Sequence, residues 1–577
     1  MKPDVETSDW ATPFEQGNGN QTTTWEACIA FHARLAEAFP QHYRLTEIGR
    51  SDAGAPLHGG VFSSDGVFEP AAARATGRAV LFIDNGIHPG EPEGIDATMA
   101  LLRDLCRDAA VRQALGRTVL VCIPAYNVDG LRERGDASRV NQLGPEAYGF
   151  RGNARHLDLN RDFVKGASRN TRAFWRWFVA WDPDVFIDTH TSNGADYPHT
   201  MTLIATQPDK LGGACGAWLR DTMLPRLYAA MAGRGFPMCP YVNPVATIPD
   251  DGIADFPDTP RFSTGWAALH HTIGFMPETH MLKPFAERLA SMRALIDASI
   301  DIVAECGAQI RTLRAADRAA FSAATRAPLS WALDETRHTM FLFSGYRAEW
   351  QPSRIGRWQR LRYDRSAPWQ REIRWFDRLR PVAQATLPRG YLLPQAWPEV
   401  AERLREQGVA MQALPADCPL RAEAWRIESF AKRPLPFEGQ HLHTDLRLRI
   451  EPLSGVARAG DWWIPLGTGR DRLIFETLEP EGADSYFRWG FFDAVLDRKE
   501  GFSDYVFEDE AERLLQAEPE LAAAFAAWIA EDPLRLDDAE ASLGFIHQHC
   551  RRWAEPAWRR YPVLRIVEPQ KLGFAAI

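Results

Sequence analysis

The stretch "AVLFIDNGIHPGEPEG" at residues 79–94 joins an unbroken apolar run to a turn that holds one histidine and two glutamates. Apolar side chains at consecutive positions are typical of a strand whose two faces are both covered. Similar runs occur at residues 118–124 ("TVLVCIP") and 184–190 ("DVFIDTH"), and a helical pattern runs from about Glu93 to Arg107. Strands that alternate with helices predict an α/β sheet with helices on its faces.

The turn after the first apolar run has the residue types of a metal site. His88 and Glu91 form the spacing H-x-x-E, and an imidazole nitrogen and a carboxylate oxygen are two of the three protein ligands of a catalytic zinc ion. His190 ends a later predicted strand. It could supply the third ligand, because sites in open α/β sheets gather at the carboxyl ends of strands. The H-x-x-E spacing alone also fits a polar turn with a surface histidine.

Two further stretches carry polar groups suited to hydrolysis. Residues 151–163 ("RGNARHLDLNRDF") concentrate arginine, asparagine and aspartate in a loop-like run, a composition suited to binding a carboxylate and polarising a carbonyl. Residues 274–280 ("GFMPETH") carry Glu278 at the end of an apolar strand. A carboxylate there, beside a metal-activated water, could act as a general base.

Length, charge and cysteine usage narrow the class of protein. The chain has 577 residues and a formal net charge of −10, so we expect two or three domains and no nucleic-acid partner. Its eight cysteines are scattered without a CxxC pair, which favours reduced thiols over a disulfide framework. The N-terminal stretch has no apolar leader region, so we expect a cytoplasmic protein without membrane contact. A secreted chain that had lost its signal peptide would look the same.

The patterning divides the chain into a first domain at residues 1–315, which carries these candidate residues, and an accessory domain at residues 325–577. A helix near residues 283–311 closes the first domain, and residues 321–331 are predicted to form a linker. The accessory domain is predicted to be β-rich at about 339–391, where aromatic and charged residues alternate, then mixed, then helical to the C-terminus.

The motifs occur together and in an order that resembles the zinc carboxypeptidase family, the carboxypeptidase A-like metallopeptidases. The resemblance rests on the H-x-x-E of residues 88–91, "NVDG" (127–130), "GNAR" and "DLNR" (152–161), "DTHTS" (188–192) and the strand-borne glutamate. It covers roughly residues 20–310. The family's fold implies an α/β domain with a mixed, mostly parallel central sheet and helices on both faces, and the C-terminal extension would be a β-rich or α+β domain.

The resemblance implies a metal centre with one zinc ion per chain. Its ligands would be His88, Glu91 and His190. Asp158 would accept a hydrogen bond from the imidazole of His88 and so orient that ring. Zinc held in this way would polarise a scissile carbonyl and lower the pKa of a water molecule.

The same resemblance implies roles in substrate binding and catalysis. Asn160 and Arg161 would bind the terminal carboxylate of the substrate. Arg155 would stabilise the oxyanion, with Arg151 as the substitute if the loop lies differently. Glu278 would be the general base that takes a proton from the attacking water and passes it to the leaving amine.

The sequence departs from the family in one segment. The family's archetypal members carry a tyrosine shortly before the catalytic glutamate, but no tyrosine lies between Tyr241 and Glu278. The substrate side-chain pocket is expected in the same segment, at about residues 255–271. Arg261 could favour an acidic side chain there, although a surface arginine in a proline-rich loop explains it more simply.

Three functions from different classes fit these residues. The first is a zinc metallocarboxypeptidase that hydrolyses a C-terminal peptide bond, with a peptide or small amide bearing a free carboxylate as substrate. The second is a zinc amidohydrolase or deacylase that acts on small N-acyl amino acids or cell-wall peptides. The third is a non-catalytic binding protein on this scaffold, which is disfavoured because every predicted ligand and the base are present.

Overall fold

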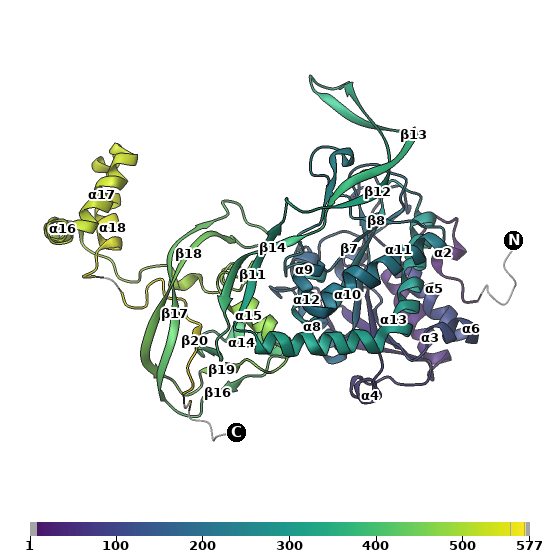
Figure 1. The fold of residues 1–577 in the computed structure, drawn as a ribbon, viewed down its shortest axis with the longest axis horizontal. Helices are drawn as coiled ribbons and strands as arrows, with labels where there is room; N and C mark the ends of the chain where they lie inside the picture. Colours follow the sequence, from purple (N-terminus) through teal and green to yellow (C-terminus); the bar gives the residue numbers. More distant parts are fainter. Residues whose placement is uncertain (1–8, 554, 571, 573–577) are drawn as a thin grey trace.

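The computed structural model describes residues 9–553, 555–570 and 572. The outer ends of the two predicted domains, residues 1–8 and 573–577, lie outside the described residues. Figure 1 shows an N-terminal half, coloured purple to teal, and a C-terminal half, coloured green to yellow, with a long helix running along the first and towards the second.

A mixed sheet forms the centre of the N-terminal half. Its strands are β1 (Tyr43–Arg50), β2 (Pro56–Phe62), β3 (Val80–Asp84), β4 (Val119–Ile123), β5 (Val185–Asp188), β6 (His190–Ser192), β7 (Met201–Ala205), β8 (Cys239–Pro240) and β10 (Ile273–His280). The order is β1-β2-β4-β3-β5-β10-β7-β8, and β6 pairs with β10. The pairs β1–β2, β2–β4 and β10–β7 are antiparallel, and the others are parallel.

The middle strands are buried at every position, as the apolar runs predict. All residues of β3, β4 and β5 are buried, and since successive side chains point to opposite faces, both faces of the sheet are covered. The parallel register pairs Asp84 with Ile123 on one side and with Asp188 on the other. These three strands therefore end at the same edge. The predicted fold class, a mostly parallel mixed sheet covered by helices, is confirmed.

Helices cover the sheet and connect its strands. α5 (Glu93–Arg107) has the predicted bounds and packs against α13 (Phe285–Ala323). The other helical elements of this half are α2 (Pro13–Gln16), α3 (Trp25–Ala38), α4 (Pro70–Ala75), α6 (Ala109–Ala114), α7 (Val128–Arg132), η1 (Leu159–Arg161), α8 (Arg169–Trp181), α9 (Pro208–Leu211), α10 (Gly213–Trp218), η2 (Leu219–Met223), α11 (Leu224–Gly233), η3 (Pro249–Asp251) and α12 (Ser263–Leu269).

The boundary between the halves differs from the prediction. The helix expected to end near residue 311 continues as α13 to Ala323, and strand β11 (Arg326–Leu333) begins almost at once. The predicted linker at residues 321–331 is therefore wrong, because a helix end and a strand occupy it.

Buried ion pairs explain why α13 runs so far. Arg314 is 3 % exposed, and its guanidinium binds Asp182 at 3.0 Å and Asp184 at 2.8 Å. Arg318, one turn later, binds Asp182 at 2.6 Å. These contacts fasten the last turns of the helix to the end of α8 and the start of β5, which no local sequence signal indicates.

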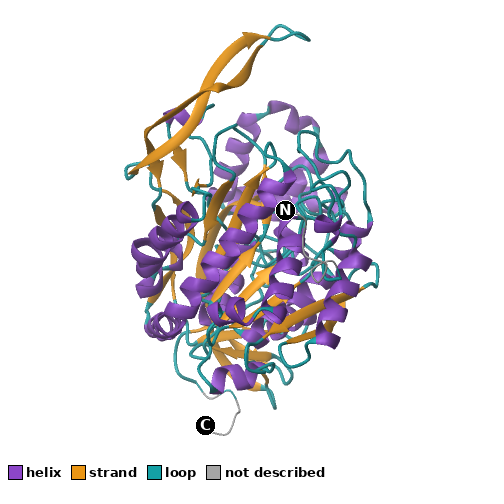
Figure 2. Cartoon of the chain, turned by 90° about the vertical axis from the view of Figure 1, so that its right-hand side faces the viewer, coloured by secondary structure: helices purple, strands orange, loops and turns teal. Residues whose placement is uncertain are grey.

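Further strands and helices form the C-terminal half. β11 pairs with β14, β12 and β13 form a hairpin that pairs with β9, and the remaining strands form a sheet in the order β16-β19-β15-β20-β17-β18. The bounds are β9 (Ile253–Ala254), β12 (Thr339–Pro352), β13 (Gln359–Phe376), β14 (Leu379–Thr386), β15 (Gly390–Leu393), α14 (Pro398–Glu406), β16 (Gln412–Ala413), β17 (Cys418–Lys432), β18 (His443–Ala457), β19 (Trp462–Pro465), α15 (Asp471–Leu478), η4 (Asp493–Val495), α16 (Asp504–Ala517), α17 (Pro519–Glu531), η5 (Pro533–Asp537), α18 (Ala539–His549) and β20 (Leu564–Ile566). Figure 2 shows the β12–β13 hairpin extending beyond the body of the molecule.

The two halves share one hydrophobic core. Its buried side chains include Phe186 and Trp266 from the first half and Phe475 and Trp489 from the second. Nε1 of Trp266 also donates a hydrogen bond of 2.8 Å to Oε1 of Gln407. The eight cysteines are free and buried. Among the described residues, no helix combines the length and apolar character that crossing a bilayer requires.

Candidate metal and substrate site

Strand ends bring the predicted site residues together. His88 and Glu91 follow β3, and His190 begins β6. β6 pairs in parallel with β10, and the register of that pair sets Glu278 opposite His190. The three motifs, far apart in the sequence, thus line one pocket of 360 Å³.

His88, Glu91 and His190 form a group that could hold a metal ion. All three are buried, and one ligand atom from each lies within 4.8 Å of the others. Nδ1 of His88 lies 3.3 Å from Oε1 of Glu91, and Nδ1 of His190 lies 3.2 Å from Oε2. The buried Nδ1 of His88 has no hydrogen-bond partner among the described residues. Two imidazole nitrogens and a carboxylate are a donor set that suits zinc, so the residues fit this ion.

Each imidazole is fixed through its other nitrogen. Nε2 of His88 lies 2.8 Å from Oδ1 of Asp158, and Nε2 of His190 lies 2.8 Å from Oδ2 of Asp188. A carboxylate in this position orients the ring and leaves Nδ1 directed at the centre. Asp188 was not predicted, although strand alternation places residues 188 and 190 on one face and could have identified it.

An arginine that was not predicted holds Glu91. Nη1 of Arg139 donates to Oε1 of Glu91 at 2.6 Å, and Nη2 donates to the carbonyl of Thr191 at 2.7 Å. Burial would raise the pKa of Glu91, but Arg139 and His88 hold it well below its usual value. Glu91 therefore stays ionised, as a metal ligand must. No motif marks Arg139, and only the fold places it here.

Glu278 faces the same pocket from β10. Its side chain is 8 % exposed. Burial and the neighbouring charge of Glu91 raise the pKa of Glu278 to about 8, against the opposing effect of His190. A carboxyl group whose pKa lies near neutrality can both accept and return a proton.

Of the two arginines considered for the oxyanion, the structure brings Arg151 to the pocket. Its Nε donates to Oδ2 of Asp158 at 3.0 Å. Arg155 is exposed, and its Nη1 donates to the carbonyl of Ala167 at 2.7 Å. The side chain of Asn153 accepts the backbone N–H of Arg155, a local turn that directs residue 155 away from the pocket.

Asn160 and Arg161 lie in η1, directly after Asp158, and both line the pocket. Oδ1 of Asn160 accepts the backbone N–H of Ser263 at 3.1 Å, and its Nδ2 donates a long hydrogen bond of 3.9 Å to Sδ of Met276. The guanidinium of Arg161 stacks 4.5 Å from the ring centre of Phe262. An amide and a guanidinium held side by side suit recognition of a carboxylate.

Tyr241 also lines the pocket, although the sequence places no tyrosine where the family pattern expects one. It follows β8, and its backbone N–H donates to the carbonyl of Leu203. Burial, together with the nearby Glu278 and Glu91, raises the pKa of its phenol. Tyr241 therefore remains a hydrogen-bond donor at neutral pH.

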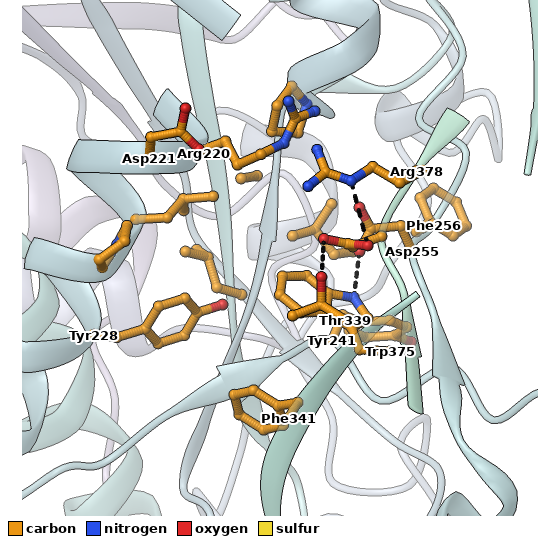
Figure 3. Close-up of a pocket in the computed structure, with 17 residues that line it drawn as sticks. Arg220, Asp221, Tyr228, Tyr241, Asp255, Phe256, Thr339, Phe341, Trp375 and Arg378 are labelled. Carbon is orange, nitrogen blue, oxygen red and sulfur yellow. Dashed lines mark hydrogen bonds and ion pairs between the residues drawn. The ribbon is translucent and has the colours of Figure 1, made fainter. Parts of the chain in front are cut away.

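A second cavity, of 320 Å³, adjoins the pocket, and Figure 3 shows the side chains that line it. The two share the lining residues Ile204, Tyr241 and Phe256. Phe341 and Trp375 of the β12–β13 hairpin also line the second cavity, so the C-terminal half supplies part of its wall. Of the segment at about residues 255–271, where the substrate side-chain pocket was expected, only Asp255 and Phe256 line this cavity.

Arg261 does not line either cavity. Its Nη2 lies 2.6 Å from Oδ1 of Asp484, which is fully buried. The guanidinium thus joins the two halves and is not free to bind an acidic substrate side chain. Arg261 is not a surface arginine either, because its side chain is 18% exposed.

Comparison with known proteins supports the resemblance. The family model described as zinc carboxypeptidase matches residues 28–203, a range that contains His88, Glu91 and His190. This part of the chain is similar to the zinc carboxypeptidase family. The chain is therefore a zinc metallopeptidase of the carboxypeptidase type. Glu278 lies beyond the matched range, but the strand that carries it pairs with the strand of His190 in the same sheet.

Relatives of this zinc carboxypeptidase are distant. Carboxypeptidase 2 of Trichophyton equinum is 22% identical over 438 residues, which cover 71% of this chain and 73% of the fungal protein. Carboxypeptidase D of Homo sapiens is 33% identical over 88 residues, which cover 15% of this chain and 6% of the human protein.

Solved structures similar to this chain include a metallo-carboxypeptidase from Burkholderia cenocepacia, at a TM-score of 0.37 and 16% identity, covering 49% of this chain and 70% of that one. A metallo-carboxypeptidase from Pseudomonas aeruginosa in complex with (2-guanidinoethylmercapto)succinic acid gives a TM-score of 0.36 and 17% identity, covering 48% of this chain and 69% of that one.

Proposed function

We propose that this protein removes the C-terminal residue of a peptide, with one zinc ion held by His88, Glu91 and His190. The observation that carries the proposal is the buried triad in which two imidazole Nδ1 atoms face one carboxylate. Zinc bound there would supply an electrophile for the scissile carbonyl and would lower the pKa of a water molecule.

The chain's own residues would move the proton and bind the developing charge. Glu278, which lies in the pocket opposite His190, would take the proton from the attacking water and return it to the leaving amine. Arg151 would donate to the developing oxyanion from the pocket wall. It takes the place of Arg155, whose guanidinium is bound to the carbonyl of Ala167.

The position of the carboxylate site would make the enzyme an exopeptidase. Asn160 and Arg161 lie in the pocket with the metal ligands, so a substrate carboxylate bound there would place the last peptide bond next to the metal centre. The substrate class is a peptide or small amide with a free C-terminal carboxylate.

We infer that the side chain of the released residue points towards the 320 Å³ cavity. Its aromatic lining, which includes Phe256, Phe341 and Trp375, favours a large apolar side chain. Phe341→Ala should raise KM for substrates ending in a large apolar residue more than for substrates ending in alanine. An equal change for both classes would exclude the cavity as the side-chain site.

Metal content and hydrolysis, measured together, test the function. The panel would be N-blocked dipeptides with free C-termini, assayed with wild type, Glu278→Gln and His190→Ala. We expect about one zinc per wild-type chain, loss of hydrolysis in both variants and loss of zinc in His190→Ala only. Zinc binding without hydrolysis of any peptide would contradict the proposal.

The same assay distinguishes a carboxypeptidase from the alternative, a deacylase, if N-acetyl amino acids are added to the panel. N-acetyl amino acids place a small acyl group where a peptidase binds the rest of the peptide. If these were hydrolysed faster than the blocked dipeptides, the protein would be an amidohydrolase that uses the same metal centre.

A further inference from the structure

A turn of the C-terminal half contacts the candidate site. The turn connects β17 to β18 and contains Glu438. Oε2 of Glu438 accepts a hydrogen bond from the backbone N–H of Asp158 at 2.8 Å, and its carbonyl oxygen accepts one from Nζ of Lys165 at 2.8 Å. Asp158 and Lys165 flank η1, so these two bonds fasten both ends of the segment that carries Asn160 and Arg161.

The backbone of this turn is unusual for the residue it holds. Glu438 and Gly439 both have positive φ, at 51° and 76°, and Phe437 and Gln440 close the turn with backbone hydrogen bonds of 2.8 and 3.1 Å. Such two-residue hairpin turns favour asparagine, aspartate or glycine at the first central position. A glutamate held there against its backbone preference, and directed at a neighbouring element, indicates a functional contact.

Asp158, whose backbone N–H is the donor in this contact, is also part of the metal centre. Oδ1 of Asp158 lies 2.8 Å from Nε2 of His88, and its backbone N–H is the group that Glu438 binds. The position of Asp158 sets the orientation of the His88 ring. It also sets where the following residues, Asn160 and Arg161, enter the pocket.

We infer that Glu438 is a positioning residue, by which the C-terminal half completes the active site through the backbone of Asp158. The inference rests on the proposed function for its effect on catalysis, but its effect on the metal does not require turnover. What the contact needs is a hydrogen-bond acceptor at the end of the side chain.

Two variants of Glu438 distinguish loss of the hydrogen-bond acceptor from a change in the structure of the turn. Glu438→Gln keeps an oxygen acceptor, whereas Glu438→Ala removes it. Glu438→Ala should weaken zinc binding about tenfold, measured by competition with a chelator, because outer contacts of a ligand histidine tune metal affinity. It should also raise KM more than it lowers kcat, and Glu438→Gln should stay close to wild type in both measurements.

Two further variants support the comparison. Lys165→Met removes the second bond to the turn and should shift zinc affinity and KM in the same direction. Glu428 lies on β17 and forms an exposed ion pair with Arg449 at 3.1 Å, so Glu428→Ala is the matched control and should change neither quantity.

The measurements distinguish failure of the positioning role of Glu438 from failure of the proposed function. Zinc affinity and KM that are unchanged in Glu438→Ala, with only a lower melting temperature, would overturn the inference, and so would a Glu438→Gln variant that behaves like Glu438→Ala. A wild-type protein that hydrolyses no peptide, but whose zinc affinity falls in Glu438→Ala and recovers in Glu438→Gln, would contradict the proposed function and leave the positioning role standing.

Discussion

At the residue scale, Arg151 is the group whose role the structure changes most. It lines the pocket, whereas Arg155 donates to the carbonyl of Ala167. Since loss of one oxyanion donor typically costs about 100-fold or more in kcat, Arg151→Ala should lower kcat by about that factor. Arg155→Ala should leave kcat close to wild type. Steady-state kinetics on one blocked dipeptide, with zinc content measured in each variant, checks this.

The reverse result would contradict the assignment. If Arg155→Ala lost activity and Arg151→Ala kept it, the loop at residues 151–163 would have to rearrange when substrate binds. Because Arg151 also bonds Asp158, the zinc measurement distinguishes a lost oxyanion donor from a lost metal.

The residues that sequence could predict are those inside ordered motifs. His88, Glu91, His190 and Glu278 lie in motifs at or shortly after an apolar run, and the structure brings them together at one sheet edge. Arg139 could not be found in this way, because it lies in a loop without a motif and meets Glu91 only through the fold.

At the scale of single elements, α13 depends on charges that it buries. Arg314 is 3 % exposed and pairs with Asp182 and Asp184. Arg314→Met would leave two carboxylates in a buried site without this partner, which should lower the free energy of unfolding by roughly 3 kcal/mol. Equilibrium denaturation in urea, followed by tryptophan fluorescence, measures this loss.

A surface pair that joins α11 to the same helix gives the control. Arg226 binds Glu305 of α13, and their side chains are 36% and 67% exposed, so Arg226→Met should cost less than about 1 kcal/mol. Equal losses in the two variants would show that burial of the Arg314 pairs does not stabilise the helix end.

The bounds of elements were predictable only where local signals suffice. α5 matches its predicted range because its apolar periodicity ends at Cys106 and the polar residues Arg107 and Asp108 follow. Residues 312–323 contain no helix breaker, so no local signal fixes the end of α13. Within this stretch Arg314 and Arg318 bind acidic partners more than a hundred residues away in the sequence, which only the fold brings close.

At the scale of the whole molecule, the C-terminal half stabilises the N-terminal half because the two share one hydrophobic core. Phe475 and Trp489 belong to the same buried cluster as Trp266. A chain ending at residue 325 would expose the apolar surface that these residues cover. We expect it to aggregate or to be digested rapidly under limited trypsin treatment, whereas the full chain resists. A soluble, protease-resistant and active truncation would contradict this view.

In the proposed function, a free C-terminal carboxylate on the substrate is required for hydrolysis at this metal centre. The most direct measurement compares one blocked dipeptide with its C-terminal amide, at equal concentration, with the zinc-loaded wild-type enzyme. We expect hydrolysis of the free acid and almost none of the amide, because Asn160 and Arg161 would bind the carboxylate. Hydrolysis of both at similar rates, or of neither, would contradict it.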